Sequence, residues 1–335
     1  MHIDLSVVWF VIIVFGTLMY IVMDGFDLGI GILMPVTRDI RERDTMVNTV
    51  APVWDGNETW LVLGGAALYG AFPLAYSIIV DALTVPLTLM LVGLIFRGVA
   101  FEFRFKAFTQ HRQFWDRAFI VGSMGATFCQ GVVVGSVVQG FDVKDQTFVG
   151  HALDWLAPFP LFCGLGLMAT YALLGATWLI MKTDGQTQQH GFALAPKLLA
   201  LLLVFVVVVS LWTLQSHPRI EARWFNAENA YALLLVPLCT LIAAYCALHG
   251  LKHKQEKMPF IASLVIVLLG FVGLGISLWP NIIPPSVSIW DAASPEISQG
   301  FMLVGALFIL PVILIYTFWS YYVFRGKVKE GEAYH

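Results

Sequence analysis

Residues 6 to 34 read SVVWFVIIVFGTLMYIVMDGFDLGIGILM, and this stretch decides the fold class. It is apolar over more than the roughly 20 helical residues that cross about 30 Å of hydrocarbon. Its apolar residues do not alternate with polar ones as in a barrel strand. Backbone in lipid has to form its hydrogen bonds within its own segment. The stretch therefore predicts a membrane-spanning helix.

The rest of the chain has the same character. Of its 335 residues, 59% are hydrophobic and 12% are charged, which is typical of membrane proteins. We predict an all-α membrane protein of nine transmembrane helices, forming a single integral membrane domain over residues 1–335. The predicted spans cover residues 6–34, 58–78, 80–101, 118–140, 158–181, 194–215, 229–249, 259–279 and 300–324.

Several other classes are disfavoured. The first run has no basic residue ahead of it, is longer than a secretory signal and lacks a small-x-small cleavage pattern, so we predict that it stays as an anchor. No basic patch with interleaved aromatic residues indicates nucleic-acid binding. The four cysteines lie inside predicted spans without a CxxC pair, which indicates packing residues.

The lysines and arginines predict the orientation in the membrane. With nine spans, sixteen of the 19 fall on one side, and only Lys144, Arg219 and Arg223 fall on the other. Cytoplasmic loops carry the excess of positive charge. We therefore predict an N-terminus outside and a cytoplasmic C-terminus.

Polar residues from the first three predicted spans fall at one depth, near the cytoplasmic boundary. They are Asp24 and Asp27 of the first span, Trp54, Asp55 and Glu58 at the start of the second, and Arg97 and Glu102 at the end of the third. In the first two spans the two acids are three residues apart and share a helix face. Charged residues within spans often mark ion or proton paths. This cluster would suit proton uptake from the cytoplasm.

Structural explanations for single residues stay open at this point. Asp55 or Asn57 can cap the second span, since Asx side chains accept hydrogen bonds from free amides at a helix start. Trp54 and Trp60 can be aromatic residues of the membrane interface.

Two further explanations concern helix packing. Arg97 can hold helices together by neutralising Asp27 or Glu102. The glycines at positions 25, 29, 31, 64 and 65 can let helices approach closely. The combination of several acids with one arginine exceeds what capping alone requires.

The chain offers little for a redox cofactor of its own. None of its eight histidines lies in the middle of a predicted span, whereas haem in a membrane bundle needs axial ligands on helices. His249 and His253 flank Lys252 at the end of a span, which favours a solvated loop over a metal site. We predict no metal site in this chain.

Three motifs carry a family resemblance. DGFDLGIG (24–31), APVWDGNETWLVLGGAAL (51–68) and LIFRGVAFEFR (94–104) resemble, in this order and spacing, the N-terminal signature of subunit II of cytochrome bd-type quinol oxidases. The likeness is closest to the cyanide-insensitive branch. The motifs cover about the first 120 residues, and beyond them the match rests on span number and loop sizes.

The resemblance implies a fold and a partner. Family members have nine helices, arranged as two four-helix bundles plus one peripheral helix. They form a heterodimer with subunit I, which binds two b-type haems and one d-type haem, and some complexes contain a small third subunit. The complex oxidises quinol, reduces O2 to water and takes protons from the cytoplasm. A structural quinone and a lipid-facing passage for O2 are further expectations.

The resemblance also implies roles for single residues. Asp27, Trp54, Asp55 and Arg97 match family positions associated with assembly, haem environment or proton supply. Glu58 replaces a glutamine of the family. We hypothesise that Asp55, with Glu58 and Asp27, passes protons toward subunit I. The alternatives are a secondary ion-coupled transporter and a purely structural assembly subunit.

Overall fold

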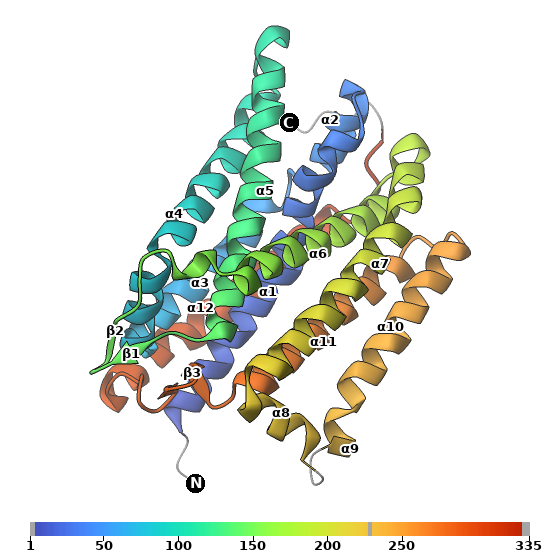
Figure 1. Cartoon of the computed structure of the whole chain (residues 1–335). Coiled ribbons are helices and arrows are strands. Elements are labelled where there is room, and N and C mark those ends of the chain that lie inside the picture. Colours follow the sequence, from blue (N-terminus) through green and yellow to red (C-terminus); the bar gives the residue numbers. More distant parts are fainter. Residues whose placement is uncertain (1–3, 227–229, 330–335) are drawn as a thin grey trace.

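The computed structural model of the chain describes residues 4–226 and 230–329 as long helices joined by short connections (Figure 1). The long helices are α1 (Leu5–Leu33), α3 (Trp54–Ala71), α4 (Pro73–Arg104), α5 (Thr109–Gln139), α6 (Pro158–Lys182), α7 (Gly185–Ser216), α10 (Leu235–Lys252), α11 (Met258–Leu278) and α12 (Glu296–Val323). The shorter helices are η1 (Met34–Val36), α2 (Ile40–Asn48), η2 (Asp154–Leu156), α8 (Pro218–Phe225) and α9 (Ala230–Leu233). Strand β1 (Val143–Lys144) pairs antiparallel with β2 (Thr147–Phe148), and β3 (Asn281–Ile283) pairs with β4 (Val287–Ser288).

The all-α membrane class is confirmed, and eight of the nine predicted spans coincide with helices that are long and apolar enough to cross a membrane. The exception is α3, which has 18 residues and carries the polar motif at its start. Length and composition alone therefore do not confirm the count of nine. The predicted span 229–249 begins outside the described residues, and its remainder corresponds to α9 and α10.

The predicted boundary between the second and third spans, at residues 78–80, is wrong. The chain turns at Phe72, and Pro73 is the first residue of α4. Proline suits this position because its ring fixes φ near the helical value and its missing N–H has no partner to lose in the first turn. Helix α3 also begins at Trp54 rather than at residue 58, so the whole polar motif is helical.

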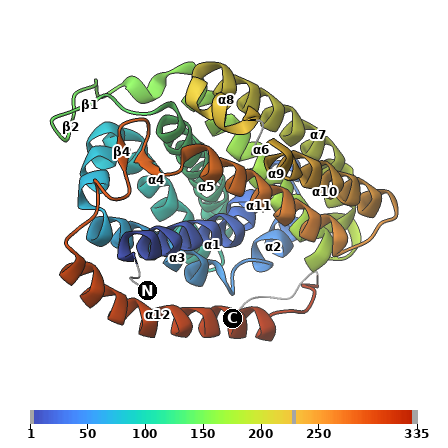
Figure 2. The same cartoon turned by 90° about the horizontal axis from the view of Figure 1, so that it is seen from below.

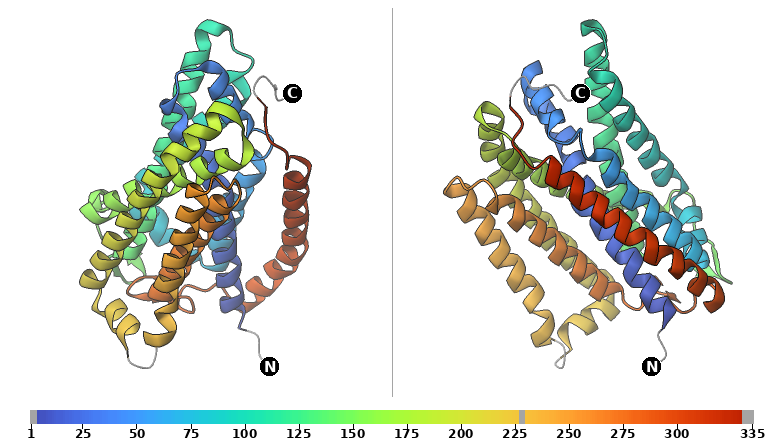
Figure 3. Two further views of the ribbon diagram at one scale, coloured as in Figure 1. Left: turned by 90° about the vertical axis from the view of Figure 1, so that its right-hand side faces the viewer. Right: turned by 180° about the vertical axis from the view of Figure 1, so that it is seen from behind.

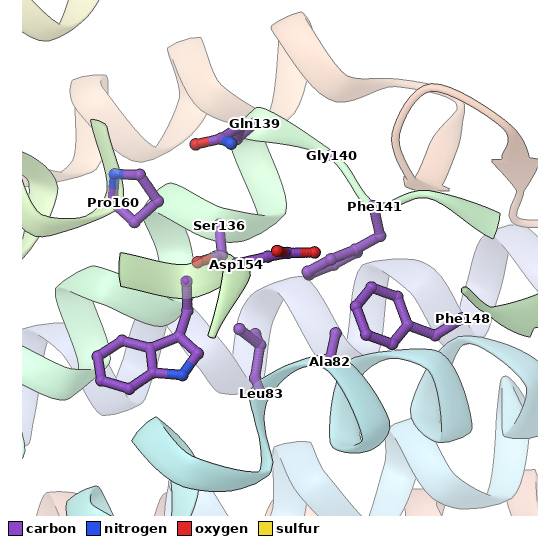
Figure 4. A pocket seen from close by; sticks show the side chains of 10 residues that line it. Ala82, Leu83, Ser136, Gln139, Gly140, Phe141, Phe148, Asp154 and Pro160 are labelled. Carbon is purple, nitrogen blue, oxygen red and sulfur yellow. The ribbon is translucent and has the colours of Figure 1, made fainter. Parts of the chain in front are cut away.

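Helix α4 is kinked at Leu83, whose φ and ψ of −120° and 21° are not helical. Pro86 follows three residues later and cannot donate to the carbonyl of Ala82. A cavity of about 30 Å³ lies beside the kink, and Ser136 and Asp154 supply polar groups among its apolar walls (Figure 4). This space is large enough for a water molecule but not for a substrate.

Helix α1 lies in the middle of the fold and packs against α3, α5 and α6 (Figure 2). Its closest crossing is with α6, where a Cβ on Gly29 would clash with the carbonyl oxygen of Tyr171 and lie 2.9 Å from the amide nitrogen of Gly175. Close approach is thus confirmed as the role of Gly29. It does not apply to Gly65, where an added Cβ would meet no atom of the described residues within 4 Å.

Helix α12 lies on the outside of the helix assembly (Figures 2 and 3). Residues 325–329 follow α12, and we call them the C-terminal strap. This strap connects the end of α12 to α6 through hydrogen bonds and ion pairs. The Lys182 ammonium at the end of α6 donates to the carbonyls of Phe324 (2.5 Å) and Gly326 (2.7 Å). In return, the amide of Val328 donates to the Lys182 carbonyl at 2.8 Å. Lys327 pairs with Asp184 at 2.7 Å and Glu256 at 2.6 Å.

Replacing Lys327 by glutamine is expected to speed hydrogen exchange at the Val328 amide, because the strap loses two ion pairs. These groups are partly exposed, so the local loss is below about 1 kcal/mol. Lys252→Gln, an exposed lysine outside the strap, is the control. Unchanged exchange at Val328 in Lys327→Gln would refute a clamping role for the ion pairs.

The strap is also expected to depend on pH. Hydrogen bonds from Lys327 and Gln188 lower the pKa of Glu256 below its ordinary value of 4.5. Although desolvation opposes it, bonding to Asp184 and Glu256 raises the pKa of Lys327 above 10.5. The ion pair between Lys327 and Glu256 therefore stabilises the strap fully between pH 4.5 and 10.5, the ordinary pKa values of the two groups. It is lost as pH falls through the lowered pKa of Glu256 or rises through the raised pKa of Lys327.

Candidate functional site

The centre of the site is a fully buried arginine on α4. Nη1 of Arg97 donates to Oδ1 of Asp24 on α1 at 2.6 Å, and both side chains are 0% exposed. Nη2 of Arg97 donates to Glu58 on α3, whose side chain is 26% exposed. One guanidinium therefore joins acids from two other helices. The predicted pairing of Arg97 with Asp27 or Glu102 is wrong.

Asp27 reaches the site through an amide rather than through the arginine. Nδ2 of Asn57 donates to Oδ2 of Asp27 at 2.7 Å and to the carbonyl of Met23 at 3.2 Å. The hydroxyl of Tyr321, on α12, donates to Oδ1 of Asn57 at 3.0 Å. Asn57 is buried inside α3, so its predicted capping role is wrong, and the structural reason is that α3 begins three residues earlier.

Asp55 marks the surface end of the cluster. It lies in the first turn of α3, where an acid suits the positive end of the helix dipole, and its residue is exposed. It does not cap the helix, because the N-cap residue is Val53 and forms no side-chain cap bond. Asp55 and Glu58 are three positions apart and share a helix face.

The tryptophans take different places. The ring of Trp54 stacks on Phe101 of α4, with centroids 4.9 Å apart and planes at 16°. Trp60 is 0% exposed and meets Phe15 edge to face at 5.7 Å, so an interfacial position for Trp60 is wrong. Trp54 thus makes a specific contact that orients the start of α3 against α4.

Glu102 does not join the cluster. Its side chain is 62% exposed and pairs with Lys106 one turn further along α4, at 3.3 Å. Arg97 and Glu102 are five residues apart, which puts them about 140° apart around a helix. The helix thus turns the side chain of Glu102 away from the other acids.

A second ionic network, which the sequence did not predict, lies where α4 ends and α5 begins. Nε of Arg104 donates to Asp116 at 2.6 Å, and Nη1 of Arg104 lies 2.7 Å from Asp44 of α2. Arg43 also pairs with Asp116, at 3.0 Å, and Arg112 pairs with Asp44. Arg104 follows Arg97 by seven residues, nearly two turns, and this spacing could have predicted its burial on the same face.

The histidines do not fit a buried haem. None of the six in the described part of the chain is buried, and His190 is engaged by Glu42, with Nδ1 2.5 Å from Oε1. Over the same residues, no group of three His, Cys, Asp or Glu side chains could hold a metal ion. Asp24 and Glu58 instead form ion pairs with Arg97.

Comparison with known proteins shows the family to which the chain is similar. Residues 5–324 match the family model of cytochrome bd terminal oxidase subunit II. The chain is 28% identical to cytochrome bd-I ubiquinol oxidase subunit 2 of Escherichia coli K12, over 98% of this chain and 96% of that protein. It is 27% identical to cytochrome bd ubiquinol oxidase subunit 2 of Bacillus subtilis 168, over 97% of both chains.

The fold agrees with these relatives. A chain of the bd oxidase structure from Geobacillus thermodenitrificans superposes with a TM-score of 0.79 at 18% identity, over 96% of this chain and 97% of that chain. The protein belongs to the family of cytochrome bd terminal oxidase subunit II, as the three motifs predicted. It is therefore a multi-pass membrane component of an oxidoreductase complex. The comparisons give no support to the ion-coupled transporter or to a purely structural subunit.

Proposed function

We propose that this chain pairs with subunit I in a quinol oxidase of a bacterial inner membrane and supplies protons for the reduction of O2 to water. Both of the named relatives are ubiquinol oxidase subunits. Since the described histidines do not fit a haem, the two b-type haems and the d-type haem belong to subunit I in this proposal. A small third subunit, a structural quinone and an O2 passage along the lipid-facing helices are compatible with it.

The proposal includes nine spans, with α3 as the ninth. At 1.5 Å per residue its 18 residues extend about 27 Å, close to the hydrocarbon thickness of about 30 Å. One four-helix bundle would contain α1, α3, α4 and α5, and the other α6, α7, α10 and α11, with α12 peripheral. An odd number of spans agrees with the start of α1 and the end of α12 on opposite sides of the helix assembly (Figure 3), and in this proposal the N-terminus is outside and the C-terminus cytoplasmic.

The observation that best supports the proton role is that acids of α1 and α3 meet at Arg97 of α4. Asp55 is exposed, and Glu58, about one turn further along the same face of α3, is half-buried. Asp24 and Asp27 are fully buried. The series thus leads from the surface to the interior. Asp24 and Asp27 each have one carboxylate oxygen without a hydrogen-bond partner among the described residues. A proton can therefore be accepted there without breaking the contacts that hold the helices.

Asp55→Asn in the intact oxidase complex tests this role. We expect haem content to stay normal, because Asp55 forms no ion pair with any residue that the structure describes. O2 reduction should slow at least about tenfold, because the path loses a proton carrier. The slowing should increase with pH, since the supply of protons from water then falls. Measurements are haem per complex, quinol-driven O2 consumption and its pH profile.

Two control variants sharpen the test. Asp55→Glu keeps a carboxylate and should recover most of the turnover. Glu102→Gln removes an acid of similar depth that lies outside the cluster, so turnover should be unchanged. A fully loaded Asp55→Asn complex with normal turnover would show that this chain only holds the assembly together.

A further inference from the structure

A cavity lined by His217, Arg219 and Trp279 lies at the end of the molecule opposite the acid cluster. It has a volume of about 270 Å³ and opens between α8, the end of α11 and the loop of the β3–β4 hairpin. This is slightly below the usual range of about 300–1,000 Å³ for pockets that enclose a whole small molecule. The space suits a compact group rather than a complete substrate.

The lining of this cavity is positively charged. It contains Arg219 and Arg223, and no aspartate or glutamate lines it. These arginines are four residues apart on α8 and share a face, whereas Glu221, halfway between them, points to the opposite side. Burial lowers the pKa of His217, another lining residue, so its ring is neutral at pH 7 and the charge comes from the two guanidinium groups.

Both arginines are held in place by neutral groups. Nη1 of Arg219 donates to the Pro285 carbonyl at 2.9 Å. Nη1 of Arg223 donates to the carbonyls of Ile276, at 2.6 Å, and Trp279. Within residues 4–226 and 230–329, neither guanidinium forms an ion pair with a carboxylate. Each arginine has five N–H donors, so donors remain for an anion.

A purely structural role would explain the hydrogen bonds of Arg223 but not the one that Arg219 forms. The carbonyls that Arg223 binds lie at and just after the last turn of α11, where a cation suits the negative end of the helix dipole. Arg219, however, lies on the exposed surface and holds only a loop carbonyl. Helix capping does not require a second arginine on the same face beside an open cavity.

The position along the membrane normal identifies the anion. The cavity lies where α7 and α11 end, which is the level of lipid headgroups, and Trp279 is among its walls. Its other walls include apolar groups of Val138, Leu278 and Pro284, which suit the neighbouring glycerol and acyl carbons. Arginine pairs bind phosphate oxygens with paired hydrogen bonds.

We propose that this cavity binds the phosphate group of a membrane phospholipid, held by Arg219 and Arg223. The site is independent of the proton path and requires only that the chain spans a membrane. A bound lipid would link α8, α11 and the β3–β4 hairpin through one headgroup.

Native mass spectrometry of the detergent-purified oxidase complex tests the site. The complex is titrated with phosphatidylglycerol, with phosphatidylethanolamine and with inorganic phosphate. We expect one tightly retained phosphatidylglycerol per complex, and at least about tenfold weaker retention in Arg219→Gln/Arg223→Gln, because two charge-assisted hydrogen-bonding groups are lost. Lys144→Gln, the other predicted outer cation, lies outside the cavity and should bind like the wild type.

Arg219→Gln alone guards against a folding defect, since it removes only the bond to the Pro285 carbonyl. It should weaken retention about threefold or more, with the assembly yield and haem content of the wild type. Equal retention of phosphatidylglycerol by the wild type and the double variant would overturn the proposal. Inorganic phosphate binding as tightly as the lipid would overturn the lipid assignment. Loss of turnover in Asp55→Asn bears on neither result.

Discussion

Arg97→Met is expected to destabilise the complex by about 3–5 kcal/mol, because it leaves the carboxylates of Asp24 and Glu58 without their counter-charge. Both acids lie at the junction of α1, α3 and α4, where the Asp24 side chain is fully buried and the Glu58 side chain is 26% exposed. Burying an unpaired charge costs far more than an ion pair contributes. We expect a low yield of assembled complex, low haem content and a large fall in the temperature of thermal unfolding.

Charge removal on the other side should reverse part of this effect. Arg97→Met combined with Asp24→Asn and Glu58→Gln removes both acids that pair with Arg97 and should recover assembly, even if proton supply stays impaired. Lys106→Met is the matched control on the same helix, since Lys106 is exposed and its pair with Glu102 is worth less than about 1 kcal/mol. Similar stability of Arg97→Met and Lys106→Met would contradict the central role of Arg97.

Gly29→Ala is the second substitution with a large expected effect. Its methyl group would clash with the Tyr171 carbonyl, which belongs to the backbone of α6 and cannot rotate away. Helices α1 and α6 would have to separate, at a cost of about 3 kcal/mol or more, since overpacking usually costs 1–3 and backbone offers no relief. Thermal unfolding of the purified complex and the yield of assembled protein measure this loss.

The same helix provides the control. At Gly16 an added Cβ would meet only the side chain of Leu63, at an ordinary 3.8 Å. Gly16→Ala should therefore be neutral or stabilising by up to about 1 kcal/mol, because alanine is the better helix former. Equal behaviour of the two variants would show that α1 and α6 are not in close contact in the assembled protein.

The fold class and most helix positions could be predicted because lipid imposes one simple requirement. Each crossing needs a long apolar run, and residues 6–34 and 259–279 meet that requirement almost residue for residue in α1 and α11. Where the chain departs from a uniform run, the prediction failed. The start of α4 at Pro73 follows from the chemistry of proline, which mean hydropathy does not register.

The acid cluster was predictable in depth but not in rotation. The positive-inside rule put Asp24, Glu58 and Arg97 at one level, and they do meet. Glu102 shares that level but lies on another face of α4. Counting about 100° per residue from Arg97 would have excluded it. The bond from Tyr321 to Asn57 had no signal in the sequence, because it depends on where α12 crosses α3.

That bond has a consequence for the order in which the protein is made. Tyr321 follows Asn57 by 264 positions. At roughly 5–20 residues per second, the ribosome needs about 13 to 53 seconds to add them. During this interval the nascent α1 and α3 are already available for insertion. The amide oxygen of Asn57, however, lacks the hydrogen bond from the Tyr321 hydroxyl. The interior of the acid cluster can thus reach its final form only after α12, which lies on the outside of the helix assembly, has been synthesised.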